Sequence, residues 1–162
     1  MTRVELTVPV DVAAPADVVW ERLTDWERQG EWMLGTRVEV MGPGDGRRLG
    51  ATLRAVTGIG PLGFADPMEI VDWAVPDGDG PRRCVVRHTG RVVRGEGVFE
   101  VVPLGRERSR VLWSELLDVP FGALGHAAWT LVRPVARAGV LVSLRRLARR
   151  CEARYRDSRP HA

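Results

Sequence analysis

Glu115 is a carboxylate on a segment whose alternating apolar residues predict a half-buried strand. Pairing this segment with the preceding strand about the turn at Gly105 keeps the residues of one face together, because an antiparallel register preserves parity. The face that carries Glu115 also carries Phe99, Trp113 and, directly opposite the carboxylate, Gly97. We therefore expect Glu115 to point into the interior, where a glycine leaves room beside it.

His88 is the second candidate for acid–base chemistry, on a predicted strand whose inner face includes Val86. Pairing this strand with the one before it sets Ile70 and Asp72 against the same face. One strand separates His88 from Glu115, so their backbones are expected to lie about 10 Å apart. We therefore expect the two side chains to flank a ligand rather than bond each other, with pKa values that burial moves toward neutrality.

Each of these residues also has a purely structural interpretation. A histidine buried in a sheet is more often hydrogen-bonded to a neighbour than catalytic. Glu115 could equally form an ion pair with Arg91 or Arg54. Asp66 precedes Pro67 and reads most simply as a turn or strand-edge residue. The sequence leaves the catalytic and the structural interpretations open.

The periodicity of the chain predicts the elements that position these residues. A long amphipathic helix is expected from Phe121 to Asp157, with a kink at Pro134 or, alternatively, a break into two helices there. Two short helices are expected after the first strand, one begun at Pro15 and one after a break at Gly30. Seven segments predict strands: 4–10, 38–41, 51–57, 64–75, 82–89, 92–102 and 110–119.

This order of elements predicts an α+β fold, a curved seven-stranded antiparallel sheet wrapped around the long C-terminal helix, with two short helices near the N-terminus. A sheet curved in this way encloses a cavity, so the layout points to a small-molecule pocket. No linker is long enough to separate a second domain. We expect a single domain over residues 1–157, followed by a short tail at 158–162.

The net charge of +3 conceals a basic C-terminal region. Residues 130–162 carry nine arginines against Glu152 and Asp157. A basic helix can bind an acidic partner, an anionic membrane or a nucleic acid. Here an apolar stripe favours a solvated face on a packed helix, and no nucleic-acid partner is expected; the stripe is Leu141, Leu144, Ala148, Cys151 and Tyr155.

Several classes of function are excluded by residues that are missing or wrongly spaced. The chain has no lysine, which excludes a lysine Schiff base and a P-loop. The segment 58–63 matches GxGxxG, yet no helix start follows it, so we expect no nucleotide cofactor. Three histidines and two lone cysteines form no zinc pattern, and neither a metal nor any other cofactor is expected.

The location of the protein is also predicted. No secretory signal opens the chain, and its longest strongly apolar run, 138–144, is far shorter than a membrane span. Cys84 and Cys151 are expected to be reduced and buried, as in a cytoplasmic protein.

Four segments carry a resemblance to a known family: VDVAAPADVVWERLTDWERQGEWM at 10–33, GATLRAV at 50–56, SRVLWSELLDVPFG at 109–122 and LRRLARRCE at 144–152. With them the chain resembles, over essentially its whole length, the START-like (SRPBCC) superfamily, most closely its polyketide cyclase/dehydrase and lipid-transport branch. The resemblance implies a helix-grip fold with a deep hydrophobic cavity. It does not decide the substrate, because members range from lipid and quinone carriers to aromatase/cyclases.

Two features depart from what the resemblance implies. The position of Glu115 is commonly apolar in the family, so a carboxylate there keeps an enzymatic role in view. The sole tyrosine is Tyr155, near the end of the chain, so a tyrosine-rich cyclase pocket is absent. Metal-dependent relatives with Rieske centres need ligands that this chain lacks.

We expect a cofactor-free protein that binds a hydrophobic small molecule, a lipid, polyketide or quinone-like compound, with a homodimer compatible with the sequence. The alternative is a cyclase or dehydratase in which Glu115 and His88 act as the acid–base pair. Ligand contacts are expected from the residues predicted to face the cavity: Ile70, Asp72, Val86, Gly97, Phe99, Trp113 and Leu131.

Overall fold

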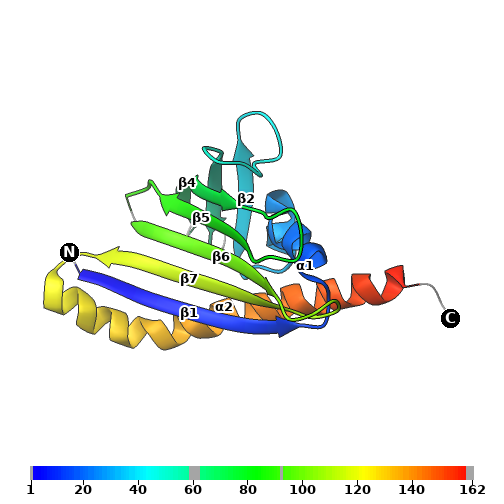
Figure 1. Cartoon of the computed structure of the whole chain (residues 1–162). Coiled ribbons are helices and arrows are strands. Elements are labelled where there is room, and N and C mark those ends of the chain that lie inside the picture. The colour runs from blue at the N-terminus through cyan, green and yellow to red at the C-terminus, as the bar shows by residue number, and fades with distance from the viewer. Residues whose placement is uncertain (1, 59–62, 92, 160–162) are drawn as a thin grey trace.

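The framework of the protein is one antiparallel sheet, seen in a computed structural model that describes residues 2–58, 63–91 and 93–159 (Figure 1). The strand order is β1-β7-β6-β5-β4-β3-β2. The strands are β1 Thr2–Val12, β2 Thr36–Met41, β3 Thr52–Thr57, β4 Phe64–Ala74, β5 Arg82–His88, β6 Gly95–Pro103 and β7 Ser109–Val119. All seven predicted strands are confirmed. Four residues of the glycine-rich segment 58–63, 59–62, lie outside the described residues.

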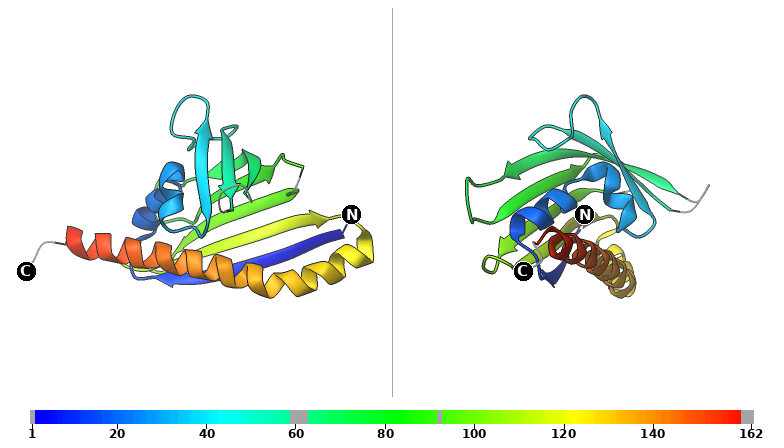
Figure 2. Two further views of the ribbon diagram at one scale, coloured as in Figure 1. Left: turned by 180° about the vertical axis from the view of Figure 1, so that it is seen from behind. Right: turned by 90° about the vertical axis from the view of Figure 1, so that its right-hand side faces the viewer.

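Two short helices connect β1 to β2 at one end of the sheet (Figure 2). The first, α1, spans Ala16–Leu23 and follows Pro15, whose φ of −57° suits the start of a helix. The second, η1, is a 3-10 helix over Trp26–Glu31. The predicted break at Gly30 is therefore wrong, since η1 runs through Gly30 and the break between the helices precedes Trp26. Through η1, buried Trp26 and Gln29 reach the interior.

The long helix α2 spans Gly122–Ser158 and runs alongside β1 and β7 (Figures 1 and 2). It continues through Pro134, so the alternative of two separate helices is excluded. Its N-terminal half curves, as expected where a proline removes a backbone hydrogen bond (Figure 1). The predicted apolar stripe is confirmed: Leu144, Ala148 and Cys151 are buried, and Leu141 and Tyr155 are partly buried.

The two halves of α2 differ in burial. The C-terminal half contributes to the hydrophobic core, as the core helix of a soluble protein does. By contrast, an 18-residue apolar stretch of α2 is long enough, by length and composition, to span a bilayer, and only 11% of it is buried. The sequence estimate, which counted the run 138–144, understated how apolar this helix is. The exposed apolar side chains on the first half include Leu124, Leu131, Val132 and Val135.

The register of the last hairpin is as predicted. Phe99 pairs with Trp113 and Gly97 with Glu115 in the regular antiparallel ladder between β6 and β7. The rings of Phe99 and Trp113 lie 5.0 Å apart, and Trp32 meets Trp113 edge-on at 6.3 Å. These aromatic contacts anchor the centre of the sheet to the segment after η1.

Both cysteines are free thiols buried in the core, as predicted. Burial raises the pKa of Cys84 to about 12, and burial likewise raises the pKa of Cys151 to about 12. Because the thiolate is the reactive form, neither residue acts as a nucleophile near neutral pH.

Candidate functional site

A cavity of about 340 Å³ lies between the inner face of the sheet and α2. Its volume falls within the range of small-molecule sites. Most of its wall is apolar, with contributions from η1, the segment that follows it, six strands, the connection between β5 and β6, and about two turns of α2. The apolar lining residues are Trp26, Met33, Leu34, Val38, Leu53, Ala55, Met68, Val86, Val93, Phe99, Trp113, Leu117, Ala136 and Val140.

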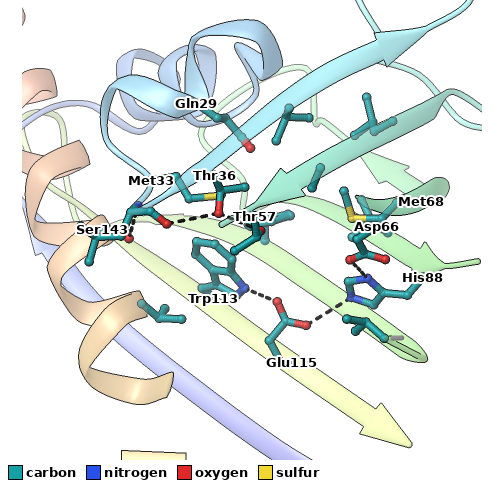
Figure 3. Close-up of a pocket in the computed structure, with 18 of the residues that line it drawn as sticks. Gln29, Met33, Thr36, Thr57, Asp66, Met68, His88, Trp113, Glu115 and Ser143 are labelled. Atoms are coloured by element: carbon teal, nitrogen blue, oxygen red, sulfur yellow. Dashed lines mark hydrogen bonds and ion pairs between the residues drawn. The ribbon is translucent and has the colours of Figure 1, made fainter. Parts of the chain in front are cut away.

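One wall of this cavity holds a continuous polar network, shown in Figure 3. The Nδ1 atom of His88 lies 2.7 Å from Asp66 Oδ2, and its Nε2 atom lies 3.3 Å from Glu115 Oε2. Trp113 Nε1 donates to Glu115 Oε1 at 2.6 Å. Both ring nitrogens of His88 are thus engaged, and within the described parts of the chain no three His, Cys, Asp or Glu side chains are arranged so that they could hold a metal ion.

His88 is the electrostatic centre of the network, with a side chain that is 6% exposed. Burial alone lowers the pKa of a histidine, since it disfavours the charged ring. Hydrogen bonds that His88 donates to Asp66 and Glu115, and the charge of both carboxylates, outweigh burial and raise the pKa of His88 to about 9. At neutral pH the ring is therefore an imidazolium that donates to both carboxylates.

Two glycines allow Glu115 and His88 to meet, and the expectation that they would only flank a ligand is wrong. They stand on β7 and β5, with β6 between them as predicted. On β6, however, Gly95 pairs with His88 and Gly97 pairs with Glu115, so no side chain stands between them. The two side chains therefore reach across the glycines to hydrogen-bond distance.

Asp66 is the member of this network that the sequence analysis missed. Its interpretation as a turn or strand-edge residue is wrong, because it is a buried residue of β4 whose carboxylate binds His88. It stands two residues before Met68, the partner of His88 in the sheet, and so shares the inner face with it. Parity along β4 could have found it, since Ile70, four residues further on, was already assigned to that face.

Asp66 is also incompletely satisfied. Its Oδ1 atom is buried without a hydrogen-bond partner in the described structure. An unpaired acceptor of this kind costs free energy, and because the atom is buried a molecule in the cavity does not reach it in this conformation. Glu115, the other carboxylate, is less enclosed, with 18% of its side chain exposed.

The prediction that Asp72 faces the cavity is wrong. A β-bulge between Ile70 and Asp72 inserts one residue into β4, so Asp72 pairs with Val85 instead of continuing the inner face. The extra residue reverses parity. Asp72 consequently points outward and forms an ion pair with Arg83 at 2.9 Å.

Leu131 is also misplaced by the sequence analysis. It is 80% exposed on the outer side of α2 and does not line the cavity. The helix contributes its next turns instead, with Ala136, Gly139, Val140 and Ser143. The sequence analysis identified correctly which face of α2 meets the sheet. It placed the start of the cavity along the helix too close to the N-terminus of α2.

The other predicted ligand-binding residues have mixed positions. Val86, Phe99 and Trp113 line the cavity. Gly97 lies beneath the Glu115 carboxylate, where an added methyl group would come within 3.5 Å of both oxygens. Ile70 is fully buried in the core and is not part of the lining.

The structural alternative for Glu115 was an ion pair with an arginine, Arg91 or Arg54. Arg54 instead pairs with Glu39 at 3.5 Å. Glu115 contacts His88 and Trp113 instead.

A second polar group lies across the cavity from the network, where β2, β3 and α2 approach one another (Figure 3). The hydroxyls of Thr36 and Thr57 share a hydrogen bond of 2.9 Å. Ser143 accepts from the backbone N–H of Leu34 at 3.1 Å and donates to the carbonyl of Gly139 at 2.9 Å. These contacts tie α2 to the segment before β2 and hold one side of the cavity together.

Comparison with known proteins identifies the relatives of this architecture. The family model described as polyketide cyclase/dehydrase and lipid transport matches residues 1–152. A search of functionally curated proteins found no match.

Solved structures of the same fold include three of different description. The ZhuI aromatase/cyclase from Streptomyces sp. R1128 is 18% identical, with a TM-score of 0.72 over 94% of this chain and 96% of that chain. A START superfamily protein from Mycobacterium smegmatis is 18% identical, with a TM-score of 0.62 over 94% and 97%. Norcoclaurine synthase from Thalictrum flavum, in complex with dopamine and hydroxybenzaldehyde, is 15% identical, with a TM-score of 0.64 over 99% and 90%.

Proposed function

The chain belongs to the polyketide cyclase/dehydrase and lipid transport family, and on that basis we propose that it binds an apolar small molecule in the cavity under α2. The observation that carries this proposal is the cavity itself, about 340 Å³ of largely apolar space with one polar network on its wall. An apolar body would pack against Val86, Phe99 and Trp113. Its polar end would lie at Glu115, the carboxylate of the network that is partly exposed.

Filling the cavity tests this proposal. Gly139 lines it, and a Cβ atom added there meets nothing within 4 Å outside the backbone of its own helix. Gly139→Leu should therefore abolish binding of apolar ligands, while thermal stability is kept or raised because leucine favours a helix by up to about 1 kcal/mol over glycine. Binding is measured by native mass spectrometry and by thermal shift with a panel of lipids and aromatic polyketides.

The matched control is Ala127→Leu, which adds a similar side chain at an exposed position of the same helix. It should bind as the wild type does. If Gly139→Leu keeps full affinity, the ligand lies elsewhere and the proposed site is wrong.

A second candidate function is acid–base catalysis, as in a cyclase or dehydratase. It is favoured by the carboxylate of Glu115, which is part of the network yet still partly accessible. Glu115 would take or return the proton of a bound ketone. His88 would act as a positioning residue, because both of its ring nitrogens already bind carboxylates.

Proton exchange measures this activity without knowledge of the natural substrate. The α-protons of an apolar aryl ketone such as 2-tetralone should exchange into D₂O faster with the protein than in buffer, as followed by NMR. Glu115→Gln should reduce the catalysed rate by about 100-fold or more, with ketone binding retained. An equal rate in Glu115→Gln, or no acceleration by the wild type, would leave only the binding role.

We also propose that the protein is cytoplasmic and that it carries lipids. Buried, reduced cysteines suit a cytoplasmic protein. A carrier of lipids through the aqueous phase needs the enclosed apolar space that this cavity supplies.

The homodimer would use the exposed side of α2. Exposed apolar residues there repeat at the three- and four-residue spacing that helix pairs use, at Leu124, Ala128, Leu131, Val135, Ala138 and Val142. Sedimentation equilibrium should show a dimer that Leu131→Glu converts to a monomer. Leu49→Glu, an equal change at a position that is 64% exposed on another part of the surface, should leave the dimer intact.

A further inference from the structure

The charges on the cavity wall indicate which polar group a ligand should carry, an inference that rests on the proposed binding function. We propose that the cavity takes an apolar molecule whose polar end is a cation or a hydrogen-bond donor, in the first place an aliphatic or aromatic amine. It should reject carboxylates with the same apolar body.

The first argument is the balance of charge. Among the described residues that line the cavity, the charged side chains are Asp66, His88 and Glu115. The chain holds 24 arginines and no lysine, and none of those arginines belongs to the described lining. One imidazolium between two carboxylates leaves an excess of one negative charge. An anionic head group would meet this charge without a compensating cation.

The second argument is the balance of hydrogen bonds. Most side-chain donors on the cavity wall are already committed: Trp113 Nε1 donates to Glu115, one N–H of Gln29 Nε2 to the carbonyl of Leu23, and Ser143 Oγ to that of Gly139. His88 gives both of its N–H groups to carboxylates. An acceptor remains in Glu115, whose side chain is still partly exposed. The wall therefore suits a ligand that donates.

The third argument is the aromatic wall beside the carboxylate. Trp113 binds Glu115 through its indole nitrogen and packs against Phe99 at 5.0 Å. Both rings line the cavity. The N–H edge of the Trp113 ring is turned to Glu115, so the rings supply apolar contact for the body of the ligand and the carboxylate supplies the attraction for an ammonium group.

The overall charge of the protein works in the opposite direction. A net charge of +3 attracts anions to the surface as a whole. A preference for amines over carboxylates would therefore reflect the local charge of the cavity and not the charge of the molecule.

A matched series of ligands tests the inference. Decylamine, decanol and decanoate share one apolar chain and differ in the head group, and each is titrated into the wild-type protein at pH 7 by calorimetry below its micellar concentration. Decylamine should bind about 10-fold or more tightly than decanoate, with decanol between them. Titration of Gly139→Leu, whose cavity is filled, identifies heat that comes from sites outside the cavity.

The outcomes separate this inference from the proposed function. Equal or tighter binding of decanoate in the cavity would overturn the inference and leave the binding function standing. If Gly139→Leu abolishes the binding of none of the three ligands, the binding function is overturned, and the inference with it. Glu115→Gln, checked for folding by circular dichroism, should narrow the ratio between amine and carboxylate to about 3-fold or less; an unchanged ratio would contradict the role given to Glu115.

Discussion

Raising the pH from 6 to 9 is expected to lower the free energy of unfolding by roughly 3 kcal/mol through His88 alone. The pKa of this residue rises from an ordinary value of 6.5 to about 9 in the folded protein. Burial opposes this change, and the two carboxylates of Asp66 and Glu115 impose it through hydrogen bonds and charge. The size of the effect makes His88 a major determinant of stability.

The direction of the effect follows from proton binding. Between pH 6.5 and 9 the folded protein holds a proton on His88 that the unfolded chain has released, so rising pH favours unfolding. Below the unfolded pKa both states are protonated, and the stabilisation is present in full. It is lost as the pH rises through the folded pKa.

Urea denaturation at intervals between pH 6 and 9, followed by tryptophan fluorescence, measures the effect. The control is His88→Gln, which keeps a polar side chain without a titrating proton and should show a nearly flat profile. This control also subtracts Cys84 and Cys151, whose raised pKa values lower stability mainly above pH 9. Parallel profiles for the wild type and His88→Gln would show that His88 is not held as an imidazolium.

The second large effect is expected for Gly95→Ala, at a cost of about 4 kcal/mol or more in unfolding free energy. Gly95 has a φ of +123°, a conformation that strains any side chain. A methyl group there would also overlap the backbone carbonyl of Leu116 on the neighbouring strand. Gly95 also pairs with His88, so its lack of a side chain leaves the space beneath the network open.

Gly105 provides a control that separates the two causes. Its φ of +117° is nearly the same, yet an added methyl group meets nothing within 4 Å. Gly105→Ala should therefore cost only the backbone strain, about 1–3 kcal/mol. Chemical denaturation of both variants at pH 7 gives the comparison. Equal losses in the two variants would mean that contact with β7 is not what requires glycine at position 95.

The sequence predicted the local structure well where a single pattern decided it. Alternation identified all seven strands, and the turn at Gly105 fixed the register of β6 and β7 because neither strand contains a bulge. Glu115 was placed on the correct face for that reason. The apolar stripe of α2 likewise gave the face that packs on the sheet.

The errors arose where one extra residue or one helical turn changes the outcome. The bulge after Ile70 turned Asp72 outward, and alternating residues give no sign of a bulge. Leu131 lies on a helix whose pattern is apolar on both its packed and exposed sides, so periodicity could not say where the cavity begins.

By itself, then, the sequence determined the strands, the long helix and the inner positions of His88 and Glu115, because these depend on residues that are close along the chain. Only the tertiary structure decided that the two side chains bond each other and that Asp66 completes the network. Those contacts join residues on three strands of a curved sheet, across two glycines that leave the space open. Distances of this kind depend on curvature and side-chain reach, which no local pattern encodes.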